Sequence, residues 1–321
     1  MRSLAVAGAL LVALTGCSSK GGANSAGGAG DAGTAKRYTI AMITHEQPGD
    51  SFWDKIRAGA EAAAKQENVD LKYSNNNDAG QQATLVQNAI DSKVDGIAVT
   101  LAFADQVGPA AQKAVQAGIP TVAFNSGISD YQKYGIKMYF GSDEDLAGQS
   151  AGQRIAAAGG GGKTICVVQE QGSVALEARC AGVKKSYPNT ENLQVNGADL
   201  PSVQQTIGAK LQQDPSIGYI VTLGAPIALA ALQAKQGVNS KAKVVTFDLN
   251  ADVAKDIQNG SMEFSIDQQP YVQGYMAVTA LWLALTNGND LGGGKPVLTG
   301  PSFVDKSNIA KIAGYAAHNT R

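Results

Sequence analysis

The fold is decided by residues 94–125, which read VDGIAVTLAFADQVGPAAQKAVQAGIPTVAFN. The stretch opens on an almost wholly apolar run, 94–100, and closes on a second one, 120–124. Between them lies an Ala-rich segment of helical spacing that stops at Gly118 and Pro120, which are residues that end helices. Strands buried on both faces of a parallel sheet are nearly continuous apolar runs. We therefore interpret residues 94–125 as a strand, a crossover helix and a second strand.

The same alternation continues on both sides of this unit, which predicts an α/β fold of the doubly wound type. The expected strands are 38–44, 69–74, 94–100, 120–124, 137–141, 163–169, 193–196, 217–223, 242–247 and 262–266. The expected helices are 52–67, 80–92, 104–117, 144–158, 175–186, 202–213, 225–236 and 253–259. Two Gly runs, 159–162 and 292–294, lack the spacing of a phosphate-binding loop and are interpreted as connections.

The N-terminus has the pattern of an exported lipoprotein. Arg2 precedes a short apolar run that closes on Leu14-Thr-Gly-Cys17, as in a signal peptide (residues 1–16) whose Cys17 accepts a lipid. Residues 17–36 are small and polar, as in a flexible tether. A buried helix or a weak membrane segment is the alternative, and the polar stretch that follows argues against it. We expect the protein to be exported and lipid-anchored to the outer face of the cytoplasmic membrane.

Composition narrows the class of protein further. The chain has 26 basic and 27 acidic side chains, and this balance gives no reason to expect a nucleic-acid partner. About 285 residues follow the tether, which is more than one core usually holds, so two lobes are expected. Once Cys17 is lipidated, only Cys166 and Cys180 remain. In an oxidising compartment this pair favours a disulfide over two buried free thiols.

Several motifs occur together in a fixed order: YTIAMIT at 38–44, GDSFW at 49–53, VDGIAVT at 94–100, AGIPTVAFN at 117–125 and VVTFD at 244–248. With them the chain resembles the type I periplasmic solute-binding proteins of the ribose-binding class. The resemblance implies two Rossmann-like lobes with parallel sheets, joined by three hinge crossings near 141–143, 268–270 and 300–301. The N-terminal lobe would comprise 37–141 plus 270–300, and the C-terminal lobe 142–268 plus 301–321. It also implies a monomer that needs no cofactor or metal, binds a sugar or polyol between closing lobes and delivers it to an ABC transporter permease.

The turn after the first strand supplies the first candidate ligand contacts. In the family this turn gives a polar contact and aromatic rings, which implies these roles for Asp50, Phe52 and Trp53. Sugars present apolar C–H faces that stack on such rings. Alternatively, Asp50 caps the first helix and the two rings belong to its core.

Asn125 and Asp248 follow directly after apolar strands, where open α/β sheets bind ligands. A carboxylate at this edge accepts hydrogen bonds from two adjacent hydroxyls, although either residue could instead organise its own loop. Thr100, at the end of another strand, is a weaker candidate of the same kind.

The remaining candidates are Arg179, Gln268 and His45. The family places an Arg where Arg179 lies, and its fork of donors suits vicinal hydroxyls; a surface Arg is the alternative. Gln268, at the second crossing, offers an amide to the ligand or to the hinge. His45 lies in the loop before Asp50, where it either contacts the ligand or organises the loop.

Three positions depart from the ribose binders. Asn125-Ser126 replaces their Asp-Arg pair, Gly224 replaces an Asn, and Leu200 stands at about the place of an aromatic residue. These departures argue against ribose as the ligand, and the smaller side chains leave room for a hexose, a deoxyhexose or an inositol.

Other classes of function fit less well. The sequence has two His residues, no nucleophile elbow and no metal-ligand cluster, so it contains no recognisable set of residues for nucleophilic or metal catalysis. Asp50 and Asp248 could in principle form a glycoside hydrolase pair. A sensor lipoprotein that presents its loaded form to a receptor would use the same closure. A repressor is excluded, because the lipobox and tether occupy the place of a DNA-binding domain.

Overall fold

The computed structural model describes residues 36–321. The expected signal peptide, the lipid site at Cys17 and the tether up to residue 35 lie outside the described residues. Within the described part, no helix is both long and apolar enough to span a membrane.

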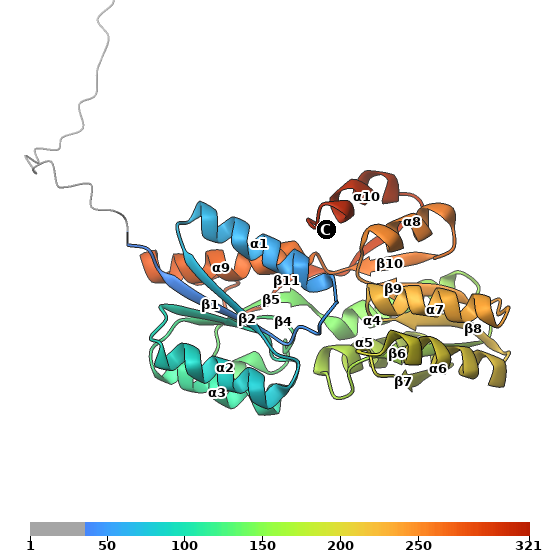
Figure 1. The fold of residues 1–321 in the computed structure, drawn as a ribbon, viewed down its shortest axis with the longest axis horizontal. Helices are drawn as coiled ribbons and strands as arrows, with labels where there is room; N and C mark the ends of the chain where they lie inside the picture. The colour runs from blue at the N-terminus through green and yellow to red at the C-terminus, as the bar shows by residue number, and fades with distance from the viewer. Residues whose placement is uncertain (1–35) are drawn as a thin grey trace, which may run out of the picture. The chain divides into compact units, whose positions relative to one another are not determined.

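The first lobe is built on a six-stranded sheet, hereafter sheet A, in the order β11-β5-β4-β3-β1-β2, with all neighbours parallel. Its strands are β1 (Thr39–Thr44), β2 (Asp70–Asn75), β3 (Gly96–Val99), β4 (Thr121–Asn125), β5 (Met138–Ser142) and β11 (Val297–Gly300). Helices α1 (Phe52–Gln66) and α9 (Pro270–Asn287) lie on one face, and α2 (Ala79–Asp91) and α3 (Ala104–Gln116) lie on the other (Figure 1). A short 3₁₀ helix, η1 (Tyr131–Tyr134), precedes β5. The unit read from residues 94–125 thus forms β3, α3 and β4, with Ile97 paired to Thr121.

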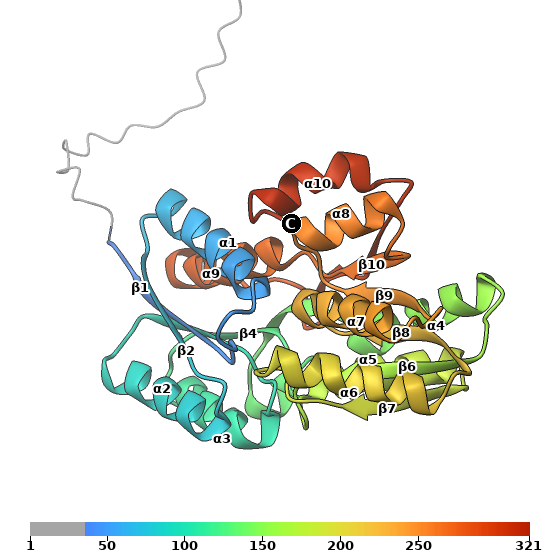
Figure 2. The ribbon, with the colours of Figure 1, turned by 45° about the vertical axis from the view of Figure 1, so that its right-hand side comes forward.

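The second lobe is built on another six-stranded sheet, hereafter sheet B, in the order β12-β10-β9-β8-β6-β7. Its strands are β6 (Lys163–Val168), β7 (Thr190–Gln194), β8 (Ile217–Thr222), β9 (Lys243–Phe247), β10 (Phe264–Asp267) and β12 (Ser302–Asp305), of which only β12 is antiparallel to its neighbour. Helices α4 (Glu144–Ala157) and α5 (Val174–Ser186) cover one face; α6 (Leu200–Gln213), α7 (Ala225–Gly237), α8 (Ala251–Asn259) and α10 (Ile309–Ala317) cover the other (Figure 2). The predicted fold class, an α/β protein with two parallel-dominated sheets, is confirmed.

The chain passes between the two sheets three times. It leaves sheet A after Ser142, returns between Asp267 and Pro270, and leaves again at Pro301. Asp267 is fully buried at the second crossing, where Arg321 donates to its Oδ2 across 2.6 Å. A backbone hydrogen bond of 3.0 Å, from Val174 N–H to the Ala102 carbonyl oxygen, joins the two lobes, whereas the Arg321–Asp267 bond lies within the second lobe.

The sequence analysis did not predict the four elements that follow residue 267, which are α9, β11, β12 and α10. Helix α9 is apolar around much of its circumference, so it lacks the one-sided pattern by which surface helices are recognised. It contacts α1 closely because both helices carry Gly at the contact. A Cβ on Gly59 would lie 2.0 Å from the Tyr271 carbonyl oxygen, and one on Gly274 would lie 2.0 Å from that of Ile56.

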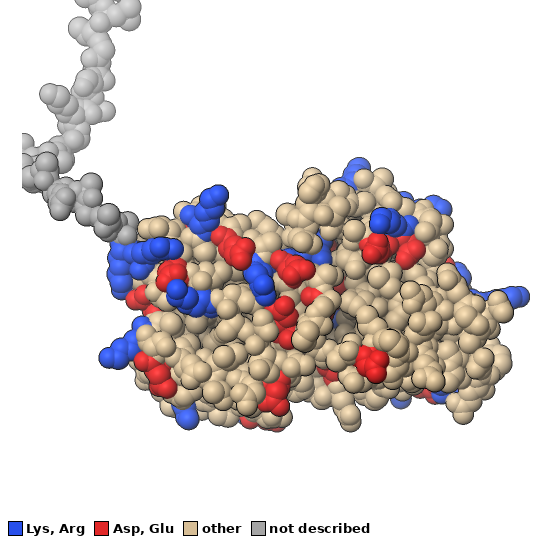
Figure 3. Space-filling model, viewed as in Figure 1, with Lys and Arg blue, Asp and Glu red and all other residues tan. Residues whose placement is uncertain are grey.

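Alternate residues of each strand enter two cores, one on each face of its sheet. Cys166 in β6 is disulfide-bonded to Cys180 in α5, with the two Cα atoms 5.7 Å apart, so the bridge ties α5 to sheet B. On the face seen in Figure 3, acidic and basic side chains are interspersed among wide uncharged areas.

Candidate functional site

A cavity lies between the two lobes, where the carboxyl ends of strands from both sheets meet. From the first lobe it is lined by His45, Asp50, Phe52, Trp53, Asn125 and Ser126. From the second lobe and the second crossing it is lined by Gln169, Glu170, Ser173, Ala175, Leu176, Arg179, Leu223, Asp248 and Gln268. Of the nine expected ligand-binding residues, the structure brings eight together here, and only Thr100 lies outside the lining.

One wall of the cavity is aromatic. The Trp53 ring meets the ring of Phe52 edge to face, with centroids 5.2 Å apart, and meets that of His45 likewise at 4.7 Å. Asp50 fixes the turn that carries them, because its Oδ1 accepts from the Phe52 backbone N–H across 3.0 Å. Ser51, and not Asp50, occupies the N-cap of α1, so the bond from Phe52 N–H to Asp50 organises the turn before the helix, and Asp50 also lines the cavity. Such a wall suits the apolar face of a sugar or cyclitol ring.

Thr100 lies behind this wall, and its position sets the tautomer of His45. The Thr100 hydroxyl oxygen accepts from the His45 backbone N–H at 3.2 Å and from the Gln82 amide at 3.0 Å. Its single proton is then available for His45 Nδ1, which lies 2.7 Å away. A neutral His45 with the proton on Nε2 follows from this arrangement. Burial first, and then the charge of Arg179, lower the pKa of His45 to about 3, so the ring stays neutral at physiological pH. Thr100 therefore bonds to His45 from outside the cavity lining, and its expected contact with the ligand stays a prediction.

Asn125 and Asp248 occupy matching places at the ends of β4 and β9. Both have positive φ, +63° and +66°, a region that Asn and Asp tolerate better than other non-Gly residues and that holds their side chains at the ligand edge. Gln268 links them, because its Nε2 donates to Asp248 Oδ1 across 2.7 Å and its Oε1 lies 3.4 Å from Asn125 Nδ2. The amide at the second crossing is thus bonded to both lobes and lines the cavity, and its contact with a ligand stays a prediction.

Arg179 is buried and lines the cavity, but its fork already has a partner. Nε and Nη2 donate to the two carboxylate oxygens of Glu144 at 2.6 and 3.1 Å, and Nη1 donates to the Leu223 carbonyl oxygen at 3.1 Å. A guanidinium has five N–H donors, so two remain for a ligand. Glu144 occupies the Nε and Nη2 donors in a bidentate pair, and the contact of Arg179 with a ligand stays a prediction.

Three carboxyl groups face the same space. Burial raises the pKa of Asp248 to about 7, against the opposing effects of Arg179 and Gln268. Burial also raises the pKa of Glu170 to about 7, with the negative charge of Asp50 adding to the shift. The pKa of Asp50 is raised as well, again chiefly by burial. These groups supply acceptors from both lobes, opposite the free donors of Arg179 and the Nε2–H of His45.

The sequence analysis missed Gln169, Glu170, Ser173 and the role of Glu144. The first two follow directly after β6, so the topological argument that found Asn125 and Asp248 could have identified them. Glu144 reaches Arg179 from α4, across a helix contact that no local pattern signals. Among residues 36–321, no group of three or more His, Cys, Asp or Glu side chains is arranged to hold a metal ion.

Known proteins are similar to this chain in sequence and in fold. The periplasmic binding protein domain matches residues 40–290. The crystal structure of a carbohydrate transporter from Acidothermus cellulolyticus, in complex with myo-inositol, is 54% identical in sequence. It superimposes with a TM-score of 0.88 and covers 89% of this chain and 100% of that one.

Two curated relatives are more distant. The xylose/arabinose-binding protein of Sulfolobus acidocaldarius is 26% identical over 238 residues, which is 69% of this chain and 59% of that protein. The xylitol-binding protein of Mycolicibacterium smegmatis is 27% identical over 234 residues, which is 67% of this chain and 66% of that protein. The match thus spans about three fifths to two thirds of the length of these two relatives.

Proposed function

The chain belongs to the periplasmic binding protein family, and we propose that it is the substrate-binding component of an ABC importer for a cyclic polyol of the myo-inositol type. The observation that carries the proposal is the cavity between the lobes, with one aromatic wall, three carboxyl groups and the free donors of Arg179. A cyclitol matches this set, because it is uncharged, has an apolar ring face and carries a hydroxyl on every ring carbon. The 54% identity to the protein crystallised with myo-inositol supports the same class of ligand.

In this proposal, ligand binding closes the lobes about the three crossings. Asp50 and the aromatic wall belong to the first lobe, whereas Glu170, Arg179 and Asp248 belong to the second. Neither group of residues can enclose a ring alone. A ligand therefore binds the closed arrangement of the lobes more tightly than the open one and shifts the equilibrium toward closure. The lobes would be 37–141 plus 270–300 and 142–268 plus 301–321. The monomeric protein would be held at the membrane by a lipid on Cys17, and the closed form would be the one that the permease recognises.

The test is calorimetric titration of the mature protein with myo-inositol, D-xylose, xylitol and D-ribose, preceded by a thermal-shift screen. A ligand that binds only the folded protein raises its melting temperature. We expect myo-inositol to bind most tightly. Asp248→Ala should weaken binding by about ten- to a hundredfold, since hydrogen bonds to charged groups contribute about 1.5–3 kcal/mol.

The matched control is Asp252→Ala, because Asp252 lies in the same lobe in α8, has a largely exposed side chain and forms a surface ion pair with Lys255. It should leave the affinity unchanged. Absence of myo-inositol binding, or equal losses in the two variants, would contradict the proposal.

A further inference from the structure

A second hollow adjoins the cavity on the side of the second lobe. It shares Asp50, Gln169 and Glu170 with the cavity, and is otherwise lined by Gln47, Pro48, Gly49, Gly197, Ala198, Leu200, Gly224, Pro226 and Ile227. Its volume is about 110 Å³, against about 40 Å³ for the inner cavity. The larger free space therefore lies outside the inner cavity.

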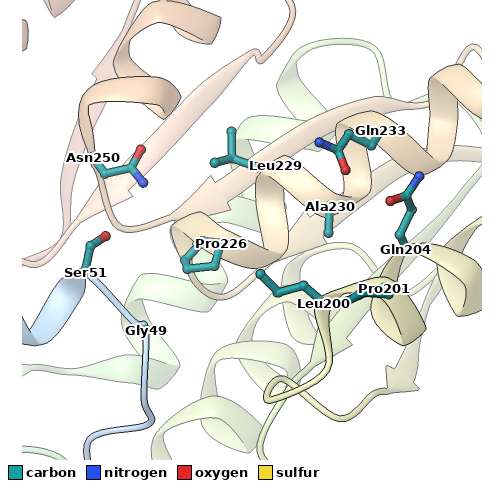
Figure 4. Close-up of a pocket in the computed structure, with 10 residues that line it drawn as sticks. All are labelled: Gly49, Ser51, Leu200, Pro201, Gln204, Pro226, Leu229, Ala230, Gln233 and Asn250. Atoms are coloured by element: carbon teal, nitrogen blue, oxygen red, sulfur yellow. The ribbon is translucent and has the colours of Figure 1, made fainter.

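The hollow continues outward into an open groove. Gly49, Leu200 and Pro226 line both, and the groove has a volume of about 480 Å³ (Figure 4). Figure 4 shows Leu200 and Pro226 close together at its near end, with Gly49 on the facing loop of the first lobe. A ligand attached to a ring in the inner cavity thus has a continuous path from Glu170 to the outer surface.

Two features indicate that the hollow is more than an exit path. The amide oxygen of Gln169 is buried and has no hydrogen-bond partner in the described chain, although it lies where the two spaces meet. A buried acceptor without a partner destabilises the empty site, so a ligand donor beside it would strengthen binding. The second feature is Gly224, where a Cβ would lie 3.3 Å from Gln169 Nε2. Any larger side chain at Gly224 would enter the hollow.

The lining is polar on one side and apolar on the other. Gln169 and Glu170 face Pro226 and Ile227, and Leu200 at the outer end is 40% exposed. A pyranose ring has the same two characters, with hydroxyls at its edge and C–H bonds on its face. A substituent of this size also matches the path into the groove.

We propose that the site takes cyclitol O-glycosides, with the cyclitol ring in the inner cavity and the glycosyl unit in the hollow beside Gln169 and Gly224. The inference rests on the proposed function, because it takes the inner cavity as the cyclitol site. It adds that one cyclitol hydroxyl points past Glu170 and carries the substituent.

The experiment is calorimetric titration with myo-inositol and with galactosyl-myo-inositol, using the wild type and four variants. Gly224→Leu fills the hollow, and its backbone tolerates the change because φ is −168°, an extended conformation open to any residue. Leu200→Trp narrows the outer end from a half-exposed position. Gln169→Leu removes the amide. Gly237→Leu is the matched control, since Gly237 lies at the far end of α7 with open space around its Cα.

We expect wild type and Gly237→Leu to bind both ligands. Gly224→Leu and Leu200→Trp should each weaken binding of the glycoside at least tenfold while changing the affinity for free myo-inositol by less than threefold. Gln169 also lines the inner cavity, so Gln169→Leu should weaken both ligands, and the glycoside more strongly. If the wild type binds myo-inositol but not the glycoside, or if every variant weakens both ligands equally, the hollow is not a subsite and the proposed function stands. If neither ligand binds the wild type, the proposed function fails, and the inference fails with it.

Discussion

Replacing Thr100 with Val tests the hydrogen bonds that position His45. The change keeps the shape of a fully buried side chain and removes one hydroxyl. His45 Nδ1 and the His45 backbone N–H then lose their partner, whereas the Gln82 amide keeps the Thr100 carbonyl oxygen at 3.0 Å. Each buried polar group left without a partner costs about 1–3 kcal/mol, so the loss of stability should be on the order of 3 kcal/mol. At about 2–4 °C per kcal/mol, the melting temperature should fall by at least about 6 °C.

The affinity for the ligand should fall as well, because Nε2–H is the donor that His45 offers to the cavity. Losing one neutral hydrogen bond costs about 0.5–1.5 kcal/mol, which is a loss of roughly three- to tenfold in affinity. Thr100→Ser retains the hydroxyl and should restore both properties. Nitrogen-15 NMR of the wild-type ring should show a neutral imidazole protonated on Nε2 that does not titrate between pH 5 and 8. A proton on Nδ1, or a titration near pH 6.5, would refute the reasoning.

Three further outcomes are expected. Between about pH 5 and 7 the stability of the ligand-free protein should fall as pH rises, and it should level off above pH 7. Burial raises the pKa of Glu170 and Asp248 to about 7, above their unfolded values, so in this window the folded state holds protons that the unfolded state has lost. Thermal unfolding should show a smaller slope in Glu170→Gln, and an identical slope would contradict this cause. Reducing the Cys166–Cys180 bridge should lower stability by about 3 kcal/mol, as for a loop of about 15 residues, and alkylation before reduction should label neither thiol. Cys17→Ser should release the exported protein from the membrane with its ligand affinity unchanged, and loss of affinity would contradict an anchor separate from the site.

Sequence predicted the elements whose partners are close in the chain. The unit of β3, α3 and β4 could be read from residues 94–125 because each apolar run lies between clear breakers. The strand ends identified Asn125 and Asp248, since topology alone puts these positions at a common edge. Helix α9 was missed for two reasons. It packs in the first lobe although it follows most of the second lobe in the chain, and its contact with α1 depends on Gly residues that allow close approach rather than on a one-sided apolar pattern.

The sequence predicted which residues lie at the cavity more accurately than which groups those residues bind. Thr100 and Arg179 both lie close to the cavity, but the partners that determine what they do are distant in sequence: His45 is 55 residues from Thr100, and Glu144 is 35 residues from Arg179. Whether a side chain is free to meet a ligand depends on which other groups already satisfy it. No local motif contains that information.

The pairing of Arg179 with Glu144 also explains how a buried cation can serve a neutral ligand. A guanidinium without a partner in this cavity would attract anions. The Glu144 carboxylate, with Oε2 2.6 Å from Arg179 Nε, neutralises that charge. Two N–H donors of the planar guanidinium remain. Removing Glu144 alone would leave a buried charge without its partner, a change that costs about 3–5 kcal/mol in other proteins. Glu144→Gln keeps the shape and should lower stability while allowing anionic compounds, such as inositol phosphates, to compete for the site. Titration of this variant with inositol 1-phosphate, against the wild type as the reference, measures that change in selectivity. Equal discrimination against the phosphate in both proteins would show that Glu144 does not set the charge preference of the cavity.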